Sequence, residues 1–300
     1  MPIIALDMDG TLLNSQKEIS PENLAALVEA QDAGCEIVIA TGRFSGDAWR
    51  ILKPYGFRHW LISSNGAMTH SPEGDILSTT PMAPADVAEA MAWLDREGFY
   101  FEVTSNRGIH AWLQHHEALL AQLEPLKAAQ PEADIRRLRD VITTWSVQKG
   151  YRPIDSIEGL MALPEEWHNL LVISFTPQRL LEGMAHFRSW GKLTLSTSWR
   201  YNFELMAPTA SKGNALGVLG ERLGISMTDT MAIGDNHNDL SMLTAAAFGV
   251  AMGNADSTIQ ELCPIVTHPH DDHGVARAIH AFLKDQELHR RVRSCLVTRL

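Results

Sequence analysis

The sequence predicts an α/β protein whose parallel-sheet core is interrupted by an inserted α+β module, and three observations support this. Short apolar runs, such as Ile3–Leu6 and Thr230–Gly234, end at an acid or a glycine, as buried parallel strands do. Helical patterns lie between such runs near both ends of the chain. Between about 82 and 206 the strands come in pairs with fewer helices, which is typical of an α+β unit.

Composition limits the class of protein. A chain of 300 residues with 45% hydrophobic and 20% charged residues is typical of a soluble globular protein with one large domain or two ordinary ones. The formal charge of −11 argues against nucleic acid or an anionic membrane as a partner. No apolar run reaches the length of a membrane span, and the three cysteines lack metal-ligand spacing. We therefore expect a cytoplasmic protein with reduced thiols, working as a monomer or a weak homodimer.

Two aspartates, Asp7 and Asp9, follow the first apolar run. Alternate residues of an extended chain point to one side, so both carboxylates can enter one crevice at the carboxyl end of the strand. Neighbouring carboxylates repel one another unless a cation lies between them, and Mg2+ favours oxygen ligands. A simple Asp-Gly turn beside a solvated acid is the alternative, and this stretch alone leaves both interpretations open.

A strand–helix–strand unit follows this stretch. Ser20-Pro21 predicts the start of a helix over 22–33, and Cys35–Ala40 forms the second strand. Such units make their strands parallel, so Thr41 emerges at the same sheet edge as Asp7. Its hydroxyl and the Gly42 amide could bind an anion, although a simple Ser/Thr turn is an alternative. Further expected elements are a helix over 44–53, a third strand over 58–64 and a hairpin over 68–78, with Asn65 facing either the crevice or a turn.

The inserted module contains its own set of expected elements. Helices are predicted over 85–97, 115–129 and 177–190, and strands over 99–104, 108–113, 169–175, 192–197 and 201–206. The polar stretch over 130–163 contains no clear element. We interpret the module's tryptophans as core residues rather than as a ligand platform. They are Trp93, Trp112, Trp145, Trp167, Trp190 and Trp199.

After the inserted module, the sequence returns to the core, and polar residues again lie at the ends of predicted strands and helices. Ser211 predicts the N-cap of a helix that ends at Gly224, so Lys212 lies in its first turn. A cation there opposes the helix dipole, which suggests a nearby anion; a solvent-exposed lysine is the alternative. Asp235 follows the strand over 230–234 and is a candidate metal ligand, whereas Asp239 either joins it or only caps the next helix over 239–245.

The last part of the chain contains a cluster of histidines and acids. Strands are expected over 248–252 and 265–266, and a helix over 275–282. The loop His268–His273 between them could be a transition-metal site, but we interpret it as a polar loop that caps the helix. The basic tail after Leu288 is expected to be a surface segment.

Together these residues suit one chemical task. An acid pair, a hydroxyl, an ammonium group and a further acid are the groups needed to handle a phosphoryl group at a metal. One carboxylate can attack phosphorus, and the second can protonate the leaving oxygen and then activate water.

The motifs that carry these residues resemble those of the haloacid dehalogenase (HAD) superfamily, and in particular its Cof-type sugar-phosphate phosphatases. The matching stretches are Asp7–Leu12, Ile39–Arg43, Ser64–Ala67, Ser211–Gly213 and Gly234–Asp239. They occur in the family's order, whereas the insert matches in position and element pattern only. The resemblance implies a Rossmann-like, three-layer parallel-sheet core over 1–81 and 207–300, with an α+β cap of type IIB over 82–206.

The resemblance also implies a function. It implies a Mg2+-dependent phosphatase that hydrolyses a small phosphorylated metabolite, such as a sugar phosphate, through an aspartyl-phosphate intermediate. Asp7 would be the nucleophile and Asp9 the general acid and base. The implied metal ligands are the Asp7 carboxylate, the Asp9 main-chain carbonyl and Asp235, supported by Asp239. The implied phosphate- and substrate-binding residues are Met8, Thr41, Gly42, Arg43, Asn65, Lys212 and Asn238.

Two other functions compete with this one. A phosphomutase would pass the phosphoryl group to a second sugar hydroxyl instead of water. A phospho-accepting signalling module also combines acids, a hydroxyl and a lysine on a parallel sheet. It is disfavoured because the Asp235 strand follows Lys212 in the chain and because such a module has no use for a large insert. The sequence does not name the substrate.

Overall fold

The computed structural model describes residues 2–148 and 151–284, so the predicted basic tail lies outside the described residues. The described chain forms two compact units. The first contains the residues up to Thr41, Trp49–Ser78 and the residues from Ser211 onward. The second contains Gly42–Ala48 and Thr79–Ala210. The predicted domain limits, 1–81 and 207–300 for the core and 82–206 for the cap, remain a prediction.

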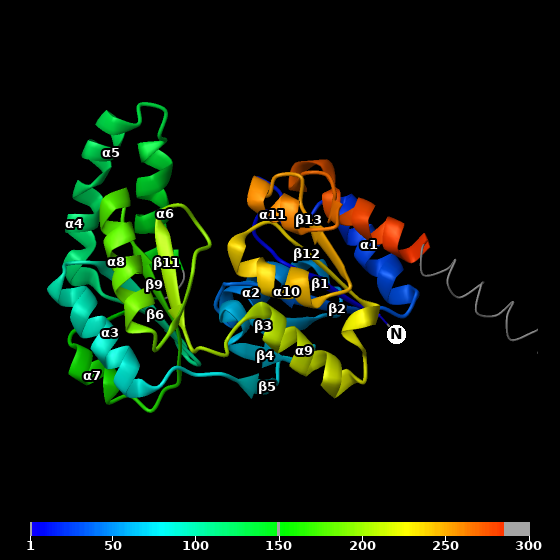
Figure 1. Ribbon diagram of the computed structural model, residues 1–300, viewed down its shortest axis with the longest axis horizontal. Helices are drawn as coiled ribbons and strands as arrows, with labels where there is room; N and C mark the ends of the chain where they lie inside the picture. Colours follow the sequence, from blue (N-terminus) through cyan, green and yellow to red (C-terminus); the bar gives the residue numbers. More distant parts are fainter. Residues whose placement is uncertain (1, 149–150, 285–300) are drawn as a thin grey trace, which may run out of the picture. The chain divides into compact units, whose positions relative to one another are not determined.

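The first unit contains a largely parallel sheet of eight strands in the order β14-β13-β12-β1-β2-β3-β4-β5 (Figure 1). The strands from β14 to β3 are parallel, and β4 runs antiparallel to β3. The strands are β1 (Ile3–Leu6), β2 (Glu36–Ala40), β3 (Trp60–Ser63), β4 (Met68–His70), β5 (Ile76–Thr79), β12 (Thr230–Gly234), β13 (Phe248–Ala251) and β14 (Ile265–Val266). The helices are α1 (Pro21–Asp32), α2 (Ser45–Leu52, partly in the second unit), α9 (Lys212–Leu223), α10 (Leu240–Ala245), α11 (Ser257–Leu262) and one over 274–284.

Helices cover both faces of this sheet. The crossover from β1 through α1 to β2 and the crossover from β12 through α10 to β13 step in opposite directions along the sheet. Because such crossovers are right-handed, α1 and α10 lie on opposite faces. Helix α9 packs on α10 and therefore shares its face. The predicted Rossmann-like, three-layer α/β core is confirmed.

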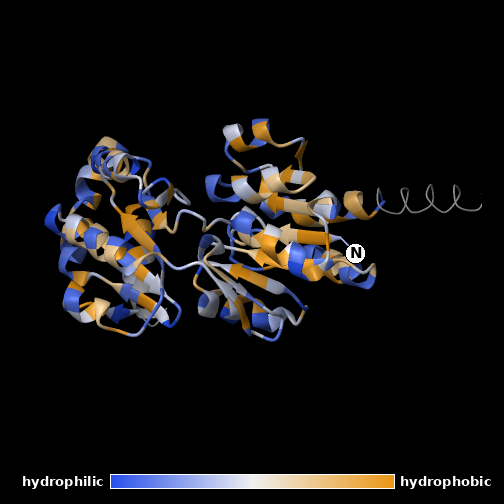
Figure 2. Cartoon of the chain, turned by 60° about the horizontal axis from the view of Figure 1, so that its bottom comes forward, coloured by the Kyte–Doolittle hydropathy of each residue, from blue (hydrophilic) through white to orange (hydrophobic). Residues whose placement is uncertain are grey.

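Local sequence signals position the helices as expected. Ser20 Oγ accepts a hydrogen bond from the Asn23 amide at 3.2 Å, and Pro21 occupies the first position of α1. Ser211 caps α9 in the same way, and Gly224 ends it with a φ of +68°. The central strands β1 and β12 are buried along their whole length, and Figure 2 shows that hydrophobic residues are frequent in the strands.

The second unit contains a six-stranded sheet in the order β10-β11-β9-β6-β7-β8. All its described pairings are antiparallel except that of β7 with β8. Its strands are β6 (Tyr100–Ser105), β7 (Gly108–Ala111), β8 (Arg152–Pro153), β9 (Trp167–Ile173), β10 (Thr194–Ser196) and β11 (Asn202–Met206). Its helices are α3 (Pro84–Arg96), α4 (His116–Ala121), α5 (Leu123–Ala129), α6 (Ile135–Gln148), α7 (Ile157–Met161) and α8 (Pro177–Trp190). The predicted α+β class of the insert is confirmed.

Two details of the second unit differ from the sequence prediction. The stretch over 130–163, which lacked a clear element, contains α6 and α7. The single helix predicted over 115–129 is divided at Gln122 into α4 and α5. Pro125 has no amide hydrogen for the carbonyl four residues earlier, which explains the break. Of the tryptophans, Trp112 and Trp167 are buried, Trp93, Trp190 and Trp199 are half-buried, and the Trp145 side chain lies outside the described ones.

No helix of the described chain is both long and apolar enough to cross a membrane.

Substitutions at two glycines of α9 can test how closely this helix packs on α10. A Cβ at Gly213 would lie 2.2 Å from the Ser241 carbonyl oxygen, whereas a Cβ at Gly217 meets nothing within 4 Å. We expect Gly213→Ala to destabilise the first unit by about 1–3 kcal/mol through overpacking. Gly217→Ala should stabilise it by about 0.5–1 kcal/mol, because alanine loses less backbone entropy. Urea unfolding of both variants measures the difference, and equal midpoints would contradict the close helix contact.

Candidate active site

Three neighbouring strands bring polar residues to one edge of the parallel sheet. Leu6 pairs with Ile233 of β12 and with Ile39 of β2, so these three strands end almost level. Asp7 follows β1, and its amide donates to the Ile233 carbonyl at 3.0 Å. Asp235 follows β12 in the same way, and Thr41 follows β2. The carboxyl ends of parallel strands therefore place Asp7, Asp235 and Thr41 at one edge.

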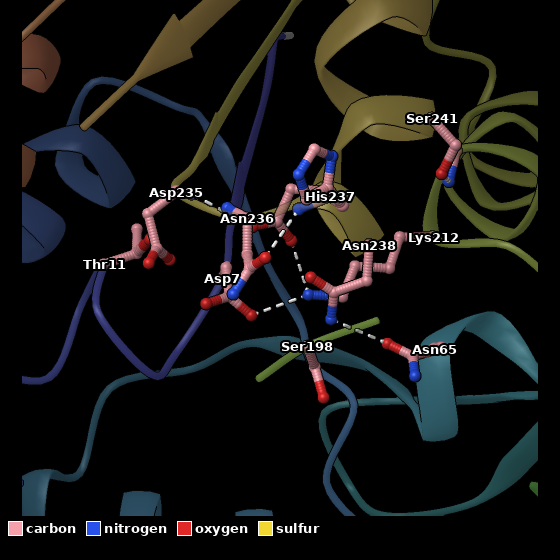
Figure 3. A network of polar contacts seen from close by, with 12 residues as sticks. Asp7, Thr11, Asn65, Ser198, Lys212, Asp235, Asn236, His237, Asn238 and Ser241 are labelled. Atoms are coloured by element: carbon pink, nitrogen blue, oxygen red, sulfur yellow. Dashed lines mark hydrogen bonds and ion pairs between the residues drawn. The ribbon is translucent and has the colours of Figure 1, made fainter. Parts of the chain in front are cut away.

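Lys212 joins two of the predicted acids (Figure 3). Its Nζ lies 2.6 Å from Asp7 Oδ1 and 2.6 Å from Asp239 Oδ1. The lysine side chain is fully buried, as is that of Asp239. The alternative that Lys212 extends into solvent is therefore wrong, and the anions that satisfy it within this unit are carboxylates.

Asp239 bonds both to Lys212 and to the loop that follows β12. Its Oδ1 accepts from Lys212, while its Oδ2 accepts from the amides of Asp235 and Asn236 at 3.0 Å each. The bond from the Asn236 amide forms half of a capping box around the short 3-10 turn His237–Asp239. Asp239 thus fixes the loop that follows β12 and orients the lysine at the same time.

Asp235 is held by the turn that follows Asp9. Thr11 Oγ1 donates to Asp235 Oδ1 at 3.0 Å, and Thr11 is completely buried. Gly10 has a φ of +83°, and a Cβ there would lie 2.4 Å from Asp235 Oδ2. Thr11 is a site residue that was not predicted, although a hydroxyl residue directly after an Asp-Gly turn at a strand end was a signal for such a role.

The concentration of acids changes the protonation of the site. Burial, together with the negative charge of Asp239, raises the pKa of Asp7 well above its usual value, and Lys212 opposes this. The same two causes raise the pKa of Asp235 to about 7, against the Thr11 hydrogen bond. Burial alone would lower the pKa of Lys212, but the carboxylates of Asp239 and Asp7 outweigh it and raise that pKa. Lys212 is therefore charged throughout the neutral range.

Asn65 and Asn238 meet beside this cluster. Asn238 Nδ2 donates to Asn65 Oδ1 at 3.0 Å (Figure 3). Asn65 is buried in a left-handed turn with Ser64 and Gly66, at φ values of +54°, +48° and +97°. The Asn65 amide also donates to the Thr41 carbonyl at 3.0 Å. Asn65 therefore serves the turn and also links the ends of β2 and β3 to the Asp235 loop.

The remaining predicted residues lie apart from these contacts. The Asp9 carboxylate is partly exposed and lies 2.9 Å from Lys17 Nζ. The Met8 side chain is buried in the core, and its carbonyl accepts from the Leu13 amide at 2.8 Å. Gly42 and Arg43 belong to the segment that groups with the second unit, where Arg43 forms an ion pair with Asp47.

The donor set suits a hard cation. Carboxylate oxygens of Asp7, Asp235 and Asp239 lie within 4.8 Å of one another, and among the described residues this is the cluster that could hold a metal ion. Lys212 bonds one carboxylate oxygen of Asp7, and Thr11 bonds one carboxylate oxygen of Asp235. The second oxygen of each carboxylate is left for a ligand. Oxygen donors with net negative charge fit Mg2+. The alternative of a transition-metal site in the 268–273 loop finds no support, because that loop contributes to no such cluster within the described chain.

The fold and this acid–lysine cluster fit the phosphoryl-transfer chemistry that the motifs predicted, and comparison with known proteins identifies the family. The family model for haloacid dehalogenase-like hydrolases matches residues 4–279. The chain therefore belongs to the haloacid dehalogenase-like hydrolase family, as the motifs predicted, and the predicted class of enzyme, a phosphatase, is confirmed.

Similar proteins match along almost their whole length. Phosphatase YwpJ of Bacillus subtilis is 39% identical over 92% of this chain and 98% of its own length. The 5-amino-6-(5-phospho-D-ribitylamino)uracil phosphatase YwtE of Bacillus subtilis is 33% identical over 95% of this chain and 99% of its own. A haloacid dehalogenase-like hydrolase from B. subtilis of known structure superimposes with a TM-score of 0.83 at 39% identity, over 93% of this chain and 99% of its own.

The buried lysine can be tested through stability. Replacing Lys212 by methionine leaves the Asp7 and Asp239 carboxylates buried without their cation, so we expect a loss of about 3–5 kcal/mol at pH 8. The loss should shrink towards pH 5, because Asp7 and Asp235, whose pKa values are raised in the folded state, take up protons as the pH falls. Lys17→Met removes an exposed ion pair and should change stability little. Urea unfolding at pH 8 and pH 5 measures the stability of both variants. If Lys212→Met loses no more stability than Lys17→Met, and equally at both pH values, the ion pairs of Lys212 with Asp7 and Asp239 do not stabilise the fold.

Proposed function

We propose that this chain is a Mg2+-dependent phosphatase that hydrolyses a small phosphorylated metabolite, such as a sugar phosphate, through an aspartyl-phosphate on Asp7. The observation that carries the proposal is the buried Lys212 ammonium, 2.6 Å from both Asp7 and Asp239, with Asp235 completing the acid cluster. The 33% identity to an enzyme named for a phosphoribitylamino-uracil substrate supports a phosphate ester of a small polyhydroxylated molecule.

In the first step Asp7 attacks phosphorus and the ester P–O bond breaks. The leaving oxygen takes a proton from Asp9, which becomes a carboxylate. Lys212 favours the ionised form of Asp7, which burial and Asp239 disfavour, and it offsets charge between nucleophile and phosphate. In the second step Asp9 takes a proton from water, the water oxygen attacks the phosphoryl group, and Asp7 is released with inorganic phosphate.

The cation would be held by the Asp7 carboxylate, the Asp9 main-chain carbonyl and Asp235, with Asp239 fixing the surrounding loop. When bound, Mg2+ supplies positive charge that brings the anionic phosphate and the carboxylate nucleophile together. Arg43 and Asn65 would contact the rest of the substrate. The phosphate itself would be bound by Met8 (by its main chain), Thr41, Gly42, Lys212 and Asn238. The bond between Asn65 and Asn238 supports a shared role for these two.

Two alternatives make different products. A phosphomutase would yield a sugar-phosphate isomer without free phosphate, and a signalling module would yield a stable phosphoprotein without turnover. The relatives named as phosphatases favour hydrolysis. A cytoplasmic location and a monomeric or weakly dimeric state remain predictions.

A substrate panel with an active-site variant tests the function. Wild-type protein should release phosphate from at least one sugar phosphate, polyol phosphate, nucleotide or pyridoxal phosphate in the presence of Mg2+, and lose this activity with EDTA. Asp7→Asn is nearly isosteric and should lower kcat by more than about 1000-fold while the protein stays folded, because the nucleophile is lost. Phosphate release is measured colorimetrically, with circular dichroism as the control for folding. Hydrolysis by Asp7→Asn at the wild-type rate would remove Asp7 as the nucleophile.

Metal binding should depend on pH. Because the pKa of Asp235 is raised to about 7, the folded protein binds more protons than the unfolded chain between about pH 4 and 7. The contribution of Asp235 to stability therefore falls as pH rises through this window, and a bound cation offsets the fall. We expect 5 mM Mg2+ to raise Tm more at pH 8 than at pH 5.5, where protons compete for the site. Differential scanning calorimetry measures this, and Asp235→Asn should abolish the shift at both pH values; a larger shift at pH 5.5 would contradict the assignment.

A further inference from the structure

The His268–His273 loop has no place in the proposed chemistry, yet it is connected to the turn that carries Asp9. Asn254, just after β13, bridges the two. Its Nδ2 donates to the Gly10 carbonyl at 2.8 Å, and its Oδ1 accepts from the His270 amide at 2.8 Å. One amide side chain thus spans from the residue after Asp9 to the histidine loop.

The same loop holds the Asp9 segment at a second point. The Ser15 amide donates to Asp271 Oδ1 at 2.8 Å, and Ser15 Oγ donates to Asp271 Oδ2 at 2.5 Å. His270 Nε2 lies 3.3 Å from the same hydroxyl. Two oxygens of one carboxylate therefore bind one serine, which is a strong and directional arrangement for an exposed contact.

These two points flank the segment over 10–15, which directly follows Asp9. Gly10 has a φ of +83° and lacks a Cβ, so its main chain has more conformational freedom than that of other residues. The Thr11 amide donates to the Met8 carbonyl at 3.4 Å, so the 2.8 Å bond from Asn254 to the Gly10 carbonyl is the shorter of the two that hold the peptide between Gly10 and Thr11. Asp9 lies on one side of Gly10, and on the other side Thr11 holds Asp235 at 3.0 Å. A rotation of the Gly10 carbonyl would therefore displace the proposed general acid and the hydroxyl that orients a proposed metal ligand.

We propose that Asn254 and the pair His270–Asp271 form a bracket that positions Asp9 for proton transfer to the leaving group. The inference rests on the proposed function, because it takes Asp9 as the general acid. Asn254, His270 and Asp271 are positioning residues, since they act through the Gly10 carbonyl and through the amide and hydroxyl of Ser15, and do not touch the reacting atoms.

The chain offers a matched control for the bracket. Gln260 Nε2 donates to the carbonyls of Met252, Gly253 and Ala255, at 3.4, 3.1 and 3.1 Å, and so holds the same turn from its other side. Within the described residues, Gln260 makes no hydrogen bond to Gly10. Gln260→Ala therefore loosens the turn around Asn254 and leaves the bond to Gly10 in place.

The kinetic test compares leaving groups. An alkyl phosphate needs a proton on its leaving oxygen, whereas 4-nitrophenyl phosphate does not, so loss of general acid catalysis lowers kcat/KM selectively for the alkyl ester. We expect Asn254→Ala to lower kcat/KM about 10- to 100-fold for the alkyl ester, as a misplaced catalytic group does, and less than about 3-fold for the aryl ester. Asp271→Ala should show a smaller loss with the same selectivity. Asp9→Asn is the reference for the full effect, and Gln260→Ala should lower both esters equally or not at all.

A measurement independent of activity accompanies the kinetics. Hydrogen–deuterium exchange of the peptide over 8–20 should become faster in Asn254→Ala and stay unchanged in Gln260→Ala. An equal loss for both esters, or the same selectivity in Gln260→Ala, would overturn the bracket. If the wild-type protein is inactive on every ester, the proposed function is overturned instead. Exchange over 8–20 then decides alone whether the bracket holds this segment. Faster exchange in Asn254→Ala only would support the bracket, and equal exchange in both variants would overturn it.

Discussion

The buried ammonium group of Lys212 is the interaction on which the rest of the site depends. It lies 2.6 Å from a carboxylate of the first strand end and 2.6 Å from one that follows β12. Removing charges from water is costly, and a buried pair is tolerated only when its geometry is good and its remaining polar atoms are bonded. Asp239 meets this condition with three donors, namely Lys212 and the amides of Asp235 and Asn236. The lysine thus ties α9 to β1 and to the loop after β12, and so joins segments that are some 200 residues apart in the chain.

The parallel sheet explains why these distant segments meet. Strands β12, β1 and β2 run side by side with their ends level, so the residue that follows each strand reaches one edge. Close approach of the loops then requires residues without side-chain bulk. A Cβ at Gly10 would collide with Asp235, and one at Gly66 would lie 2.2 Å from the Ser211 carbonyl oxygen next to Lys212. Glycines in these motifs therefore serve geometry, while the acids and the lysine serve chemistry.

These physical roles also explain how far prediction from sequence could go. Asp7, Asp235 and Lys212 follow strands or begin a helix, and strand ends and caps leave local signals that one sequence can reveal. The contacts of Asp239 with Lys212 and of Asn65 with Asn238 could not be predicted, because each depends on a partner from another part of the chain. Helix α6 was not predicted because most of its first residues are charged, which makes its narrow apolar face hard to recognise; they are Arg136, Arg137, Arg139 and Asp140. Leu138 and Ile142 form that face and belong to the hydrophobic cluster that contains Leu119 and Leu123. The bond from Asn254 to Gly10 joins residues 244 positions apart, and no local pattern predicts it.

The charge balance of the site links its stability to its function. Three carboxylates, Asp7, Asp235 and Asp239, share one ammonium group, and burial raises the pKa of Asp7 and Asp235 rather than letting both ionise freely. A fully charged site thus carries an excess of negative charge, which a cation relieves and a phosphate alone would worsen. For the proposed metal-dependent reaction, electrostatics therefore favours binding of the cation before the anionic substrate or together with it. The same excess of negative charge makes the site without a ligand take up protons near neutral pH. The carboxylates that suit the site for the proposed phosphoryl transfer are therefore also the groups that destabilise the fold when no ligand is bound.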